Sequence, residues 1–221
     1  MSSMPERVPV SDSAPSDEIL LAEARAGDER AFAAIVDRYE GRVAATVVSM
    51  LGPGDEAEDV GQETFIRLYR YLDRYRGDAS LGTYLTRIAM NLSLTALRKR
   101  KRWFARFVSV ESTPGGEPDD GRVPAGPGLE MLAVDSDDGP LGRLEQTERR
   151  HRVHQALADL NPDHRAVVVL RWIDGLSTKE AAVALGIPEG TVMSRLSRAM
   201  DRLAVSLKEE YGSSKGDRDA G

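Results

Sequence analysis

The residues best suited to chemistry form a row of hydroxyls and guanidiniums near the C-terminus. Thr191, Ser194, Arg195, Arg198 and Arg202 recur at helical spacing. The stripe on the opposite side of the same helix is apolar: Val192, Leu196, Ala199 and Leu203. Arginines and hydroxyls on an exposed helical face are what a recognition helix presents to a DNA major groove. The alternative is a solvated face on an ordinary three-helix bundle.

The residues just before this row favour DNA binding over that alternative. Ser177 and Glu180 have the spacing of a capping box, which predicts the start of a helix. The turn Gly186-Ile187-Pro188 then separates this helix from the next. Two helices joined by a short glycine-containing turn predict a helix-turn-helix. Thr191 lies in the first turn of the second helix, where free backbone amides favour a phosphate.

Two further groups of residues are ambiguous by themselves. Arg98–Arg102 is wholly basic and precedes Trp103 and Phe104. The basic side chains could bind phosphates and the aromatic rings could stack on unpaired bases. The alternative is that the cations simply end a solvated helix. Asp59, Gln62 and Glu63 share one helical face, and the simplest interpretation of that face is a solubilising surface.

Catalytic groupings are poor. The chain has no cysteine and three histidines, His151, His154 and His164. None of the histidines has carboxylates at metal-site spacing, and no phosphate-binding glycine loop or nucleophile elbow occurs. We therefore expect no catalytic residue, no metal, no cofactor and no enzyme.

The elements that position these residues are all helical. Apolar residues follow a helical period over 17–102 and 141–208, and no segment alternates convincingly at strand period. The fold class is all-α, in two small domains. In the first domain Asp17 is expected to cap a helix that stops at Gly27, and Asp28 to open the next. Asp55 and Glu58 resemble a capping box for a helix that runs to about Tyr75.

A loop and further helices complete the expected pattern. A loop covers 75–80 and a fourth helix follows to Arg102. In the second domain helices are expected at 141–159, from Pro162 to Gly175, after Ser177, and from Glu189 to Leu207.

Composition and charge set the wider frame. The chain has 221 residues, of which 41% are hydrophobic and 30% charged. No apolar run is long enough to cross a membrane and no signal core is visible, so we expect a cytoplasmic protein. The net charge of −6 is distributed unevenly along the chain, because residues 107–148 carry ten acidic residues and only two arginines. Glycine, proline and aspartate mark 108–140 as a flexible acidic linker, with tails at 1–16 and 209–221.

Three stretches of the chain resemble a known family. AEDVGQETFIRLYR (57–70) and YRGDASLGTYLTRIAMNLSLTALRKRKR (75–102) are similar to region 2 of bacterial sigma factors of the extracytoplasmic-function type. LNPDHRAVVVLRWIDGLSTKEAAVALGIPEGTVMSRLSRAMDRL (160–203) is similar to region 4. The resemblance implies region 2 over 17–107 and region 4 over 141–208, joined by the acidic linker. It further implies that the linker threads polymerase channels as an electrostatic substitute for RNA.

The resemblance also implies roles for particular residues. The surface that grips the β′ clamp helices of core RNA polymerase would be Asp59, Gln62, Glu63, Phe65 and Tyr69. Capture and separation of the −10 element would involve Arg76, Gly77, Asp78, Leu81, Tyr84, Arg87, Asn91, Arg98 and Lys101. Reading of the −35 duplex would involve Glu189, Thr191, Ser194, Arg195 and Arg198. The implied partners are the β′ and β subunits of the polymerase, promoter DNA and an anti-sigma factor, without membrane insertion.

Departures from the family pattern limit these assignments. Leu81 and Tyr84 stand where many members have Phe and Trp, so base capture would use weaker stacking. Met193 stands where many have Lys or Arg, so the expected contacts with the −35 element rest more on Ser194, Arg195 and Arg198. A classical helix-turn-helix repressor or activator is the alternative, with 17–102 as a sensor or dimer domain. Such a regulator has no need of the helix and loop at 55–80.

Overall fold

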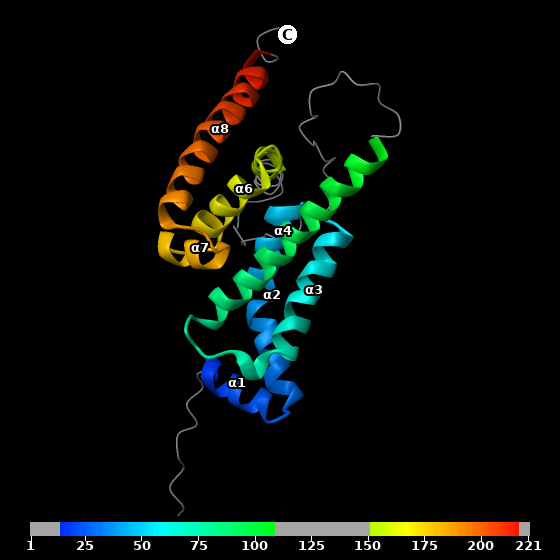
Figure 1. The fold of residues 1–221 in the computed structure, drawn as a ribbon, viewed down its shortest axis with the longest axis vertical. Coiled ribbons are helices and arrows are strands. Elements are labelled where there is room, and N and C mark those ends of the chain that lie inside the picture. Colours follow the sequence, from blue (N-terminus) through cyan, green and yellow to red (C-terminus); the bar gives the residue numbers. More distant parts are fainter. Residues whose placement is uncertain (1–13, 109–150, 217–221) are drawn as a thin grey trace, which may run out of the picture.

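The computed structural model describes residues 14–108 and 151–216, and within these ranges every regular element is helical (Figure 1). The first range contains α1 (Asp17–Arg25), α2 (Glu29–Leu51), α3 (Asp55–Arg70), a short 3₁₀ turn (Leu72–Arg74) and α4 (Leu81–Val108). The second contains a helix at 151–158, α6 (Pro162–Val168), a π-helical turn η3 (Val169–Ile173), α7 (Thr178–Leu185) and α8 (Glu189–Gly216). We call these two groups the N-terminal bundle and the C-terminal domain. The all-α prediction is confirmed.

Side-chain caps fix several helix starts. The Asp28 carboxylate accepts from the backbone of Arg30 at 2.8 Å and opens α2 as expected. Asn161 caps α6 with Pro162 at its first position, and Ser177 with Glu180 forms the predicted capping box of α7. Gly186 ends α7 at φ +65°, a left-handed conformation that glycine adopts without strain.

Other local predictions were wrong. α1 is capped by Ser16 and not by Asp17, which is the first helical residue. Gly54 precedes α3 with no side-chain cap, so Asp55 does not act in a capping box. α3 ends at Arg70, because the chain turns there into the 3₁₀ segment that buries Leu72. By contrast, the helix expected from Pro162 to Gly175 is present, α-helical to Val168 and π-helical from Val169 to Ile173.

The N-terminal bundle packs α2 centrally between α1, α3 and α4. Its interior is formed by large aliphatic side chains that are fully buried, among them Ile35, Val43, Val47, Leu68 and Leu85. Burial of each such side chain stabilises the fold by about 1.5–3 kcal/mol. α4 lies across α2 (Figure 1). This packing positions the exposed face of α4 and the loop that precedes α4.

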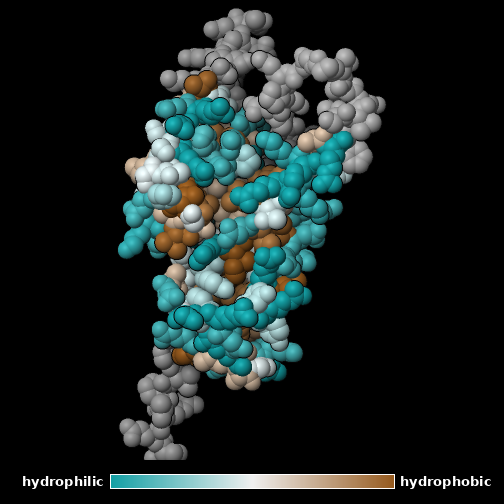
Figure 2. All heavy atoms as spheres, viewed as in Figure 1, coloured by the Kyte–Doolittle hydropathy of each residue, from teal (hydrophilic) through white to brown (hydrophobic). Residues whose placement is uncertain are grey.

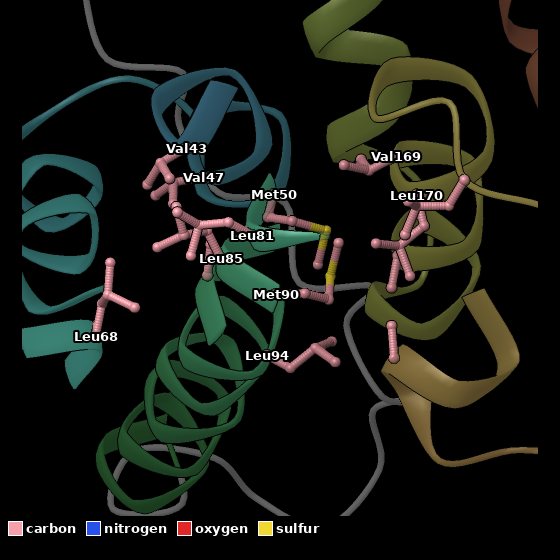
Figure 3. Packing of buried hydrophobic residues seen from close by; sticks show 14 of the residues in the cluster. Val43, Val47, Met50, Leu68, Leu81, Leu85, Met90, Leu94, Val169 and Leu170 are labelled. Carbon is pink, nitrogen blue, oxygen red and sulfur yellow. The ribbon is translucent and has the colours of Figure 1, made fainter. Parts of the chain in front are cut away.

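The N-terminal bundle and the C-terminal domain pack against each other, because one apolar core runs through both. Met50, Met90 and Leu94 of the N-terminal bundle face Val169 and Leu170 of the C-terminal domain (Figure 3). In the space-filling view apolar residues gather along the middle of the molecule, and hydrophilic residues dominate on either side (Figure 2). The sequence pattern did not predict this contact. Residues 1–13, 109–150 and 217–221, which include the expected acidic linker from residue 109 onward, lie outside the described residues. The expected tail at 209–221 was wrong in part, because α8 continues to Gly216.

Candidate functional site

The first candidate surface is the outer face of α3. Asp59 and Gln62 are exposed, and Tyr69 is 58% exposed. Glu63 is half-buried, and its Oε1 accepts from Arg67 Nε at 2.8 Å in an ion pair one turn along the helix. These four side chains therefore lie on one side of α3 and are available to a partner.

The apolar members of that face are fixed from behind. The Tyr69 ring packs edge-on against Phe32 of α2, with centroids 5.0 Å apart. Phe65 is only partly exposed and packs on the core, so it supports the face more than it presents itself. Ile66 is 42% exposed on the same side. Sequence reasoning missed Ile66, although its spacing of four residues from Gln62 places it there.

The second surface begins with the loop before α4. Arg76, Gly77 and Asp78 are exposed, and Gly77 has φ +78°, which explains glycine there. The Tyr75 hydroxyl donates to the Ala79 carbonyl at 2.6 Å, across the loop. Burial raises the pKa of Tyr75, so its hydroxyl stays protonated and remains a donor.

Further hydrogen bonds anchor the chain on either side of the loop. Arg25 of α1 donates to the carbonyl of Leu72 at 3.2 and 3.1 Å, and to that of Tyr75 at 2.6 Å. Ser80 Oγ accepts from the Thr83 backbone at 3.2 Å, as a cap for α4. Arg25 was not recognised from the sequence, because it lies 47 and 50 residues from its partners.

Helix α4 continues this surface. Arg87 and Asn91 are exposed, while Tyr84 is half-buried with its ring 5.0 Å from that of Tyr75. Leu81 does not belong to the surface, because its side chain is 1% exposed and packs in the core. The expectation that Leu81 contacts a base therefore does not fit this structure.

The basic end of α4 lies further along. Arg98 and Lys101 are exposed, followed by Trp103 at 54% and Phe104 at 47% exposure. Arg100 differs from its neighbours, since it forms an ion pair with Glu56 of α3. The exposed cations and the loop before α4 thus belong to one helix-long strip of the N-terminal bundle.

The third surface is α8 with the turn before it. Val192 and Ala199 are fully buried, so the opposite stripe must face outward. Ser194 and Arg198 are exposed, Thr191 is half-buried, and Glu189 is exposed at the first helical position. The structure thus brings all five predicted residues of this group, Arg195 included, to one helix.

Arg195 is already engaged within the chain. Its Nη2 lies 3.2 Å from Asp163 Oδ2 of α6, and the arginine side chain is 26% exposed. His164 follows Asp163 in α6. Its pKa is lowered by burial and then by the charges of Arg202, Arg195 and Arg198. Sequence reasoning missed Asp163 and His164, because only the packing of α6 on α8 brings them beside the arginines.

The described residues contain no group of three or more His, Asp or Glu that could hold a metal ion. Among the helices of these same residues, none is both long and apolar enough to cross a membrane. Of the histidines, His151 contacts Gln155 one turn along its own helix at 3.1 Å. The three exposed surfaces are therefore the candidates for function.

Comparison with known proteins gives these surfaces a context. The family model for sigma-70 region 2 matches residues 35–103, and that for sigma-70 region 4 matches residues 150–203. The chain is 34% identical to the ECF RNA polymerase sigma factor SigW of Bacillus subtilis, over 86% of this chain and 95% of the relative. It is 33% identical to the ECF RNA polymerase sigma-E factor of Escherichia coli K12, over 85% and 92%.

Two solved structures are similar in fold. One is that of CnrH in complex with the cytosolic domain of CnrY, with a TM-score of 0.57, 27% identity, and coverage of 88% of this chain and 99% of that chain. The other is the sigma factor RpoE in complex with the anti-sigma factor NepR from Bartonella quintana, with a TM-score of 0.57, 25% identity, and coverage of 80% and 96%.

Proposed function

The chain belongs to the ECF family of RNA polymerase sigma factors, and on that premise we propose that it binds core polymerase through α3, reads a −35 duplex through α8 and opens a −10 element through α4. Transcription initiation is the function of the family, and sigma factors are not enzymes. The observation that carries the proposal is the presence of three separate exposed surfaces, each of the chemistry that its target requires.

The α3 face suits a basic protein partner. Asp59 and Gln62 are exposed acceptors, and Tyr69 and Ile66 add apolar area beside them. Aromatic and aliphatic anchors flanked by charge are typical of tight interfaces, with charge complementarity selecting the partner. We assign this face, with Glu63, to the β′ clamp helices of the polymerase, and Phe65 to its support.

The α8 face suits duplex DNA. Ser194 and Arg198 are exposed on the helix that follows the turn at 186–188, and Thr191 lies in its first turn. Bidentate arginine contacts with guanine are worth about 1–3 kcal/mol of discrimination each. Because Arg195 is paired with Asp163, DNA must displace that carboxylate before Arg195 reaches a base.

The loop and face of α4 suit a single strand. A base taken out of the stack needs a rigid pocket with polar edges, and unstacking costs a few kcal/mol. Hydrogen bonds of Arg25 and of the Tyr75 hydroxyl anchor the loop at 76–80, and Asn91 and Arg87 supply exposed polar groups on the helix that follows it. Arg98 and Lys101 provide phosphate contacts along the same helix.

We also propose an anti-sigma factor as a partner. Both similar structures show a sigma factor, or a protein similar in fold, bound to a second chain, and one of these chains is named as an anti-sigma factor. A partner of this kind would have to cover one of the exposed surfaces to prevent initiation.

Co-purification with core polymerase tests the proposal. Tagged chain is mixed with purified core enzyme, and the complex is isolated by gel filtration. We expect a stoichiometric complex that forms without DNA. A helix-turn-helix repressor would need no such complex, so absence of binding to core polymerase would reject the sigma assignment of the α3 face.

A further inference from the structure

One arginine of α1 connects that helix to the loop at 76–80, which precedes α4. Arg25 Nε and Nη2 donate to the Leu72 carbonyl at 3.2 and 3.1 Å, and Nη2 also donates to the Tyr75 carbonyl at 2.6 Å. A single guanidinium therefore joins the 3₁₀ turn to the residue directly before the loop. Arginine suits this task, because its planar fork carries several donors in fixed directions.

Tyr75 extends this anchor to the rest of the loop. Its hydroxyl donates to the Ala79 carbonyl at 2.6 Å, so Tyr75 is bonded to α1 through its backbone and to the far side of the loop through its side chain. Its ring packs against that of Tyr84 in the first turn of α4, with centroids 5.0 Å apart. A movement of the Tyr75 backbone would therefore displace both the loop and a side chain of the α4 face.

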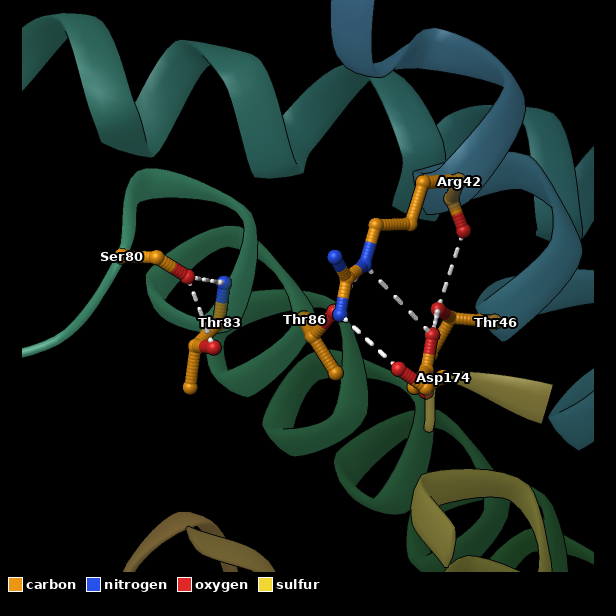
Figure 4. A network of polar contacts seen from close by, with 6 residues as sticks. All are labelled: Arg42, Thr46, Ser80, Thr83, Thr86 and Asp174. Atoms are coloured by element: carbon orange, nitrogen blue, oxygen red, sulfur yellow. Dashed lines mark hydrogen bonds and ion pairs between the residues drawn. The ribbon is translucent and has the colours of Figure 1, made fainter. Parts of the chain in front are cut away.

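The other end of the loop is anchored within α4 itself (Figure 4). Ser80 Oγ accepts from the Thr83 backbone at 3.2 Å and lies 2.9 Å from the Thr83 hydroxyl oxygen. These contacts span three residues, whereas the anchor from Arg25 to Tyr75 spans 50. Arg25 therefore ties the start of the loop to a distant part of the N-terminal bundle.

Helix α1 is itself fixed to α2. Leu20 and Leu21 bury its inner face. At its start, the Asp17 carboxylate accepts hydrogen bonds from Arg38 Nη1 at 2.6 Å and from the Tyr39 hydroxyl, both on α2. The arginine that anchors the loop thus projects from a helix whose own position is set by the bundle.

We propose that Arg25 is a positioning residue for the capture of a −10 base. The inference rests on the proposed function of the loop at 76–80, and adds a residue that precedes the match to region 2, which begins at residue 35. Arg25 touches no base and acts through Tyr75. A pocket that is already ordered pays less when the base enters, so the anchor should strengthen the binding of that base selectively.

Positioning differs from two simpler roles of a surface arginine. An arginine that only stabilises the fold changes the fraction of active protein, which lowers the binding of every DNA sequence by the same factor. An arginine that only contacts a phosphate weakens all sequences alike, and its removal makes binding less dependent on salt. A positioning residue should instead change the ratio of affinities at one base.

The test uses holoenzyme assembled from core polymerase and the full chain. The probes are fluorescent single-stranded oligonucleotides with the −10 element of a promoter mapped by run-off transcription, taken from both strands, each with one base replaced by an abasic site. Anisotropy gives the ratio of affinities for the intact and the abasic strand at each position, which we call the abasic penalty.

A variant in which the loop 76–80 is replaced identifies the captured base, because only at that position should the abasic penalty of the wild type disappear. There the wild-type penalty is expected to be about 5- to 150-fold, the range for one base stacked on a protein side chain. Arg25→Ala should reduce it to about twofold or less, while the penalties at all other positions stay unchanged.

Two further variants serve as controls. Arg25→Lys should restore the penalty only in part, because one ammonium keeps the charge but not the fork that joins two carbonyls. Arg30→Ala removes another exposed arginine of the N-terminal bundle and should behave as the wild type.

The outcomes separate this inference from the proposed function. An unchanged penalty in Arg25→Ala, or an equal loss of affinity for every oligonucleotide, overturns the positioning role while the loop replacement still demonstrates base capture. Full restoration by Arg25→Lys also overturns it, since charge alone would then suffice. If the loop replacement itself keeps every wild-type penalty, the loop captures no base, and the proposed function of the loop fails together with the inference.

Discussion

Removal of the Asp163 carboxylate should strengthen binding to the −35 duplex. Asp163 lies 3.2 Å from the guanidinium of Arg195, and 48% of its side chain is exposed. An ion pair this exposed is worth about 0.2–1 kcal/mol. DNA must spend that free energy to release Arg195, so Asp163→Asn should tighten binding by about 1.4- to 5-fold. Arg195→Ala should weaken it by about 1–3 kcal/mol if the arginine contacts a base.

Fluorescence anisotropy of a labelled −35 duplex measures both changes, and a double-mutant cycle connects them. In the Arg195→Ala background, Asp163→Asn should have almost no effect, because the group that it releases is gone. Asp201→Asn, an exposed carboxylate on α8, is the control for the general loss of negative charge. Equal tightening by Asp163→Asn with and without Arg195 would refute the reasoning.

Three further predictions concern the other surfaces and pH. Asp59→Lys with Glu63→Lys should abolish co-purification with core polymerase while circular dichroism stays unchanged, and retained binding would reject that assignment. Asn91→Ala and replacement of the loop 76–80 should each prevent the reaction of promoter thymines with permanganate on duplex DNA, because the −10 element is not opened. The reactivity should partly recover on a template mismatched at −10. Wild-type reactivity of both variants on duplex DNA would show that the loop is ordinary connecting structure. Burial and then the charges of nearby arginines lower the His164 pKa, and DNA phosphates should offset the arginine part of this effect. Binding to the −35 duplex should therefore tighten as the pH falls, and the response should disappear in His164→Gln.

Much of the fold follows from local sequence signals. The helix starts at Asp28, Asn161 and Ser177 are set by side chains within three residues of the backbone groups that they cap. The buried stripe with Val192 and Ala199 follows from helical period alone. The capping box at Asp55 was wrong because the same residue pattern also suits an exposed first turn, where acids favour the helix dipole.

The candidate surfaces were only partly predictable, because local sequence signals place residues on helical faces but do not determine their tertiary contacts. Asp59, Gln62, Arg87 and Asn91 lie exposed on predicted helical faces. Leu81 was misplaced, because the resemblance supplies a position but not its burial. Contacts between residues far apart in sequence give no local signal.

The contact of Asp174 with Thr46 shows this limit most clearly, since 128 residues separate the two. Nothing in either local pattern marks them as partners. A buried aspartate just before Gly175 reads in the sequence as a simple helix end.

Run-off transcription tests the central claim most directly. Purified core polymerase is combined with the chain and a promoter library, and the 5′ ends of the transcripts are mapped. We predict initiation that depends on the chain, at start sites that share one sequence near −35 and another near −10. Transcripts that are absent, or that start at the same positions without the chain, would contradict the account.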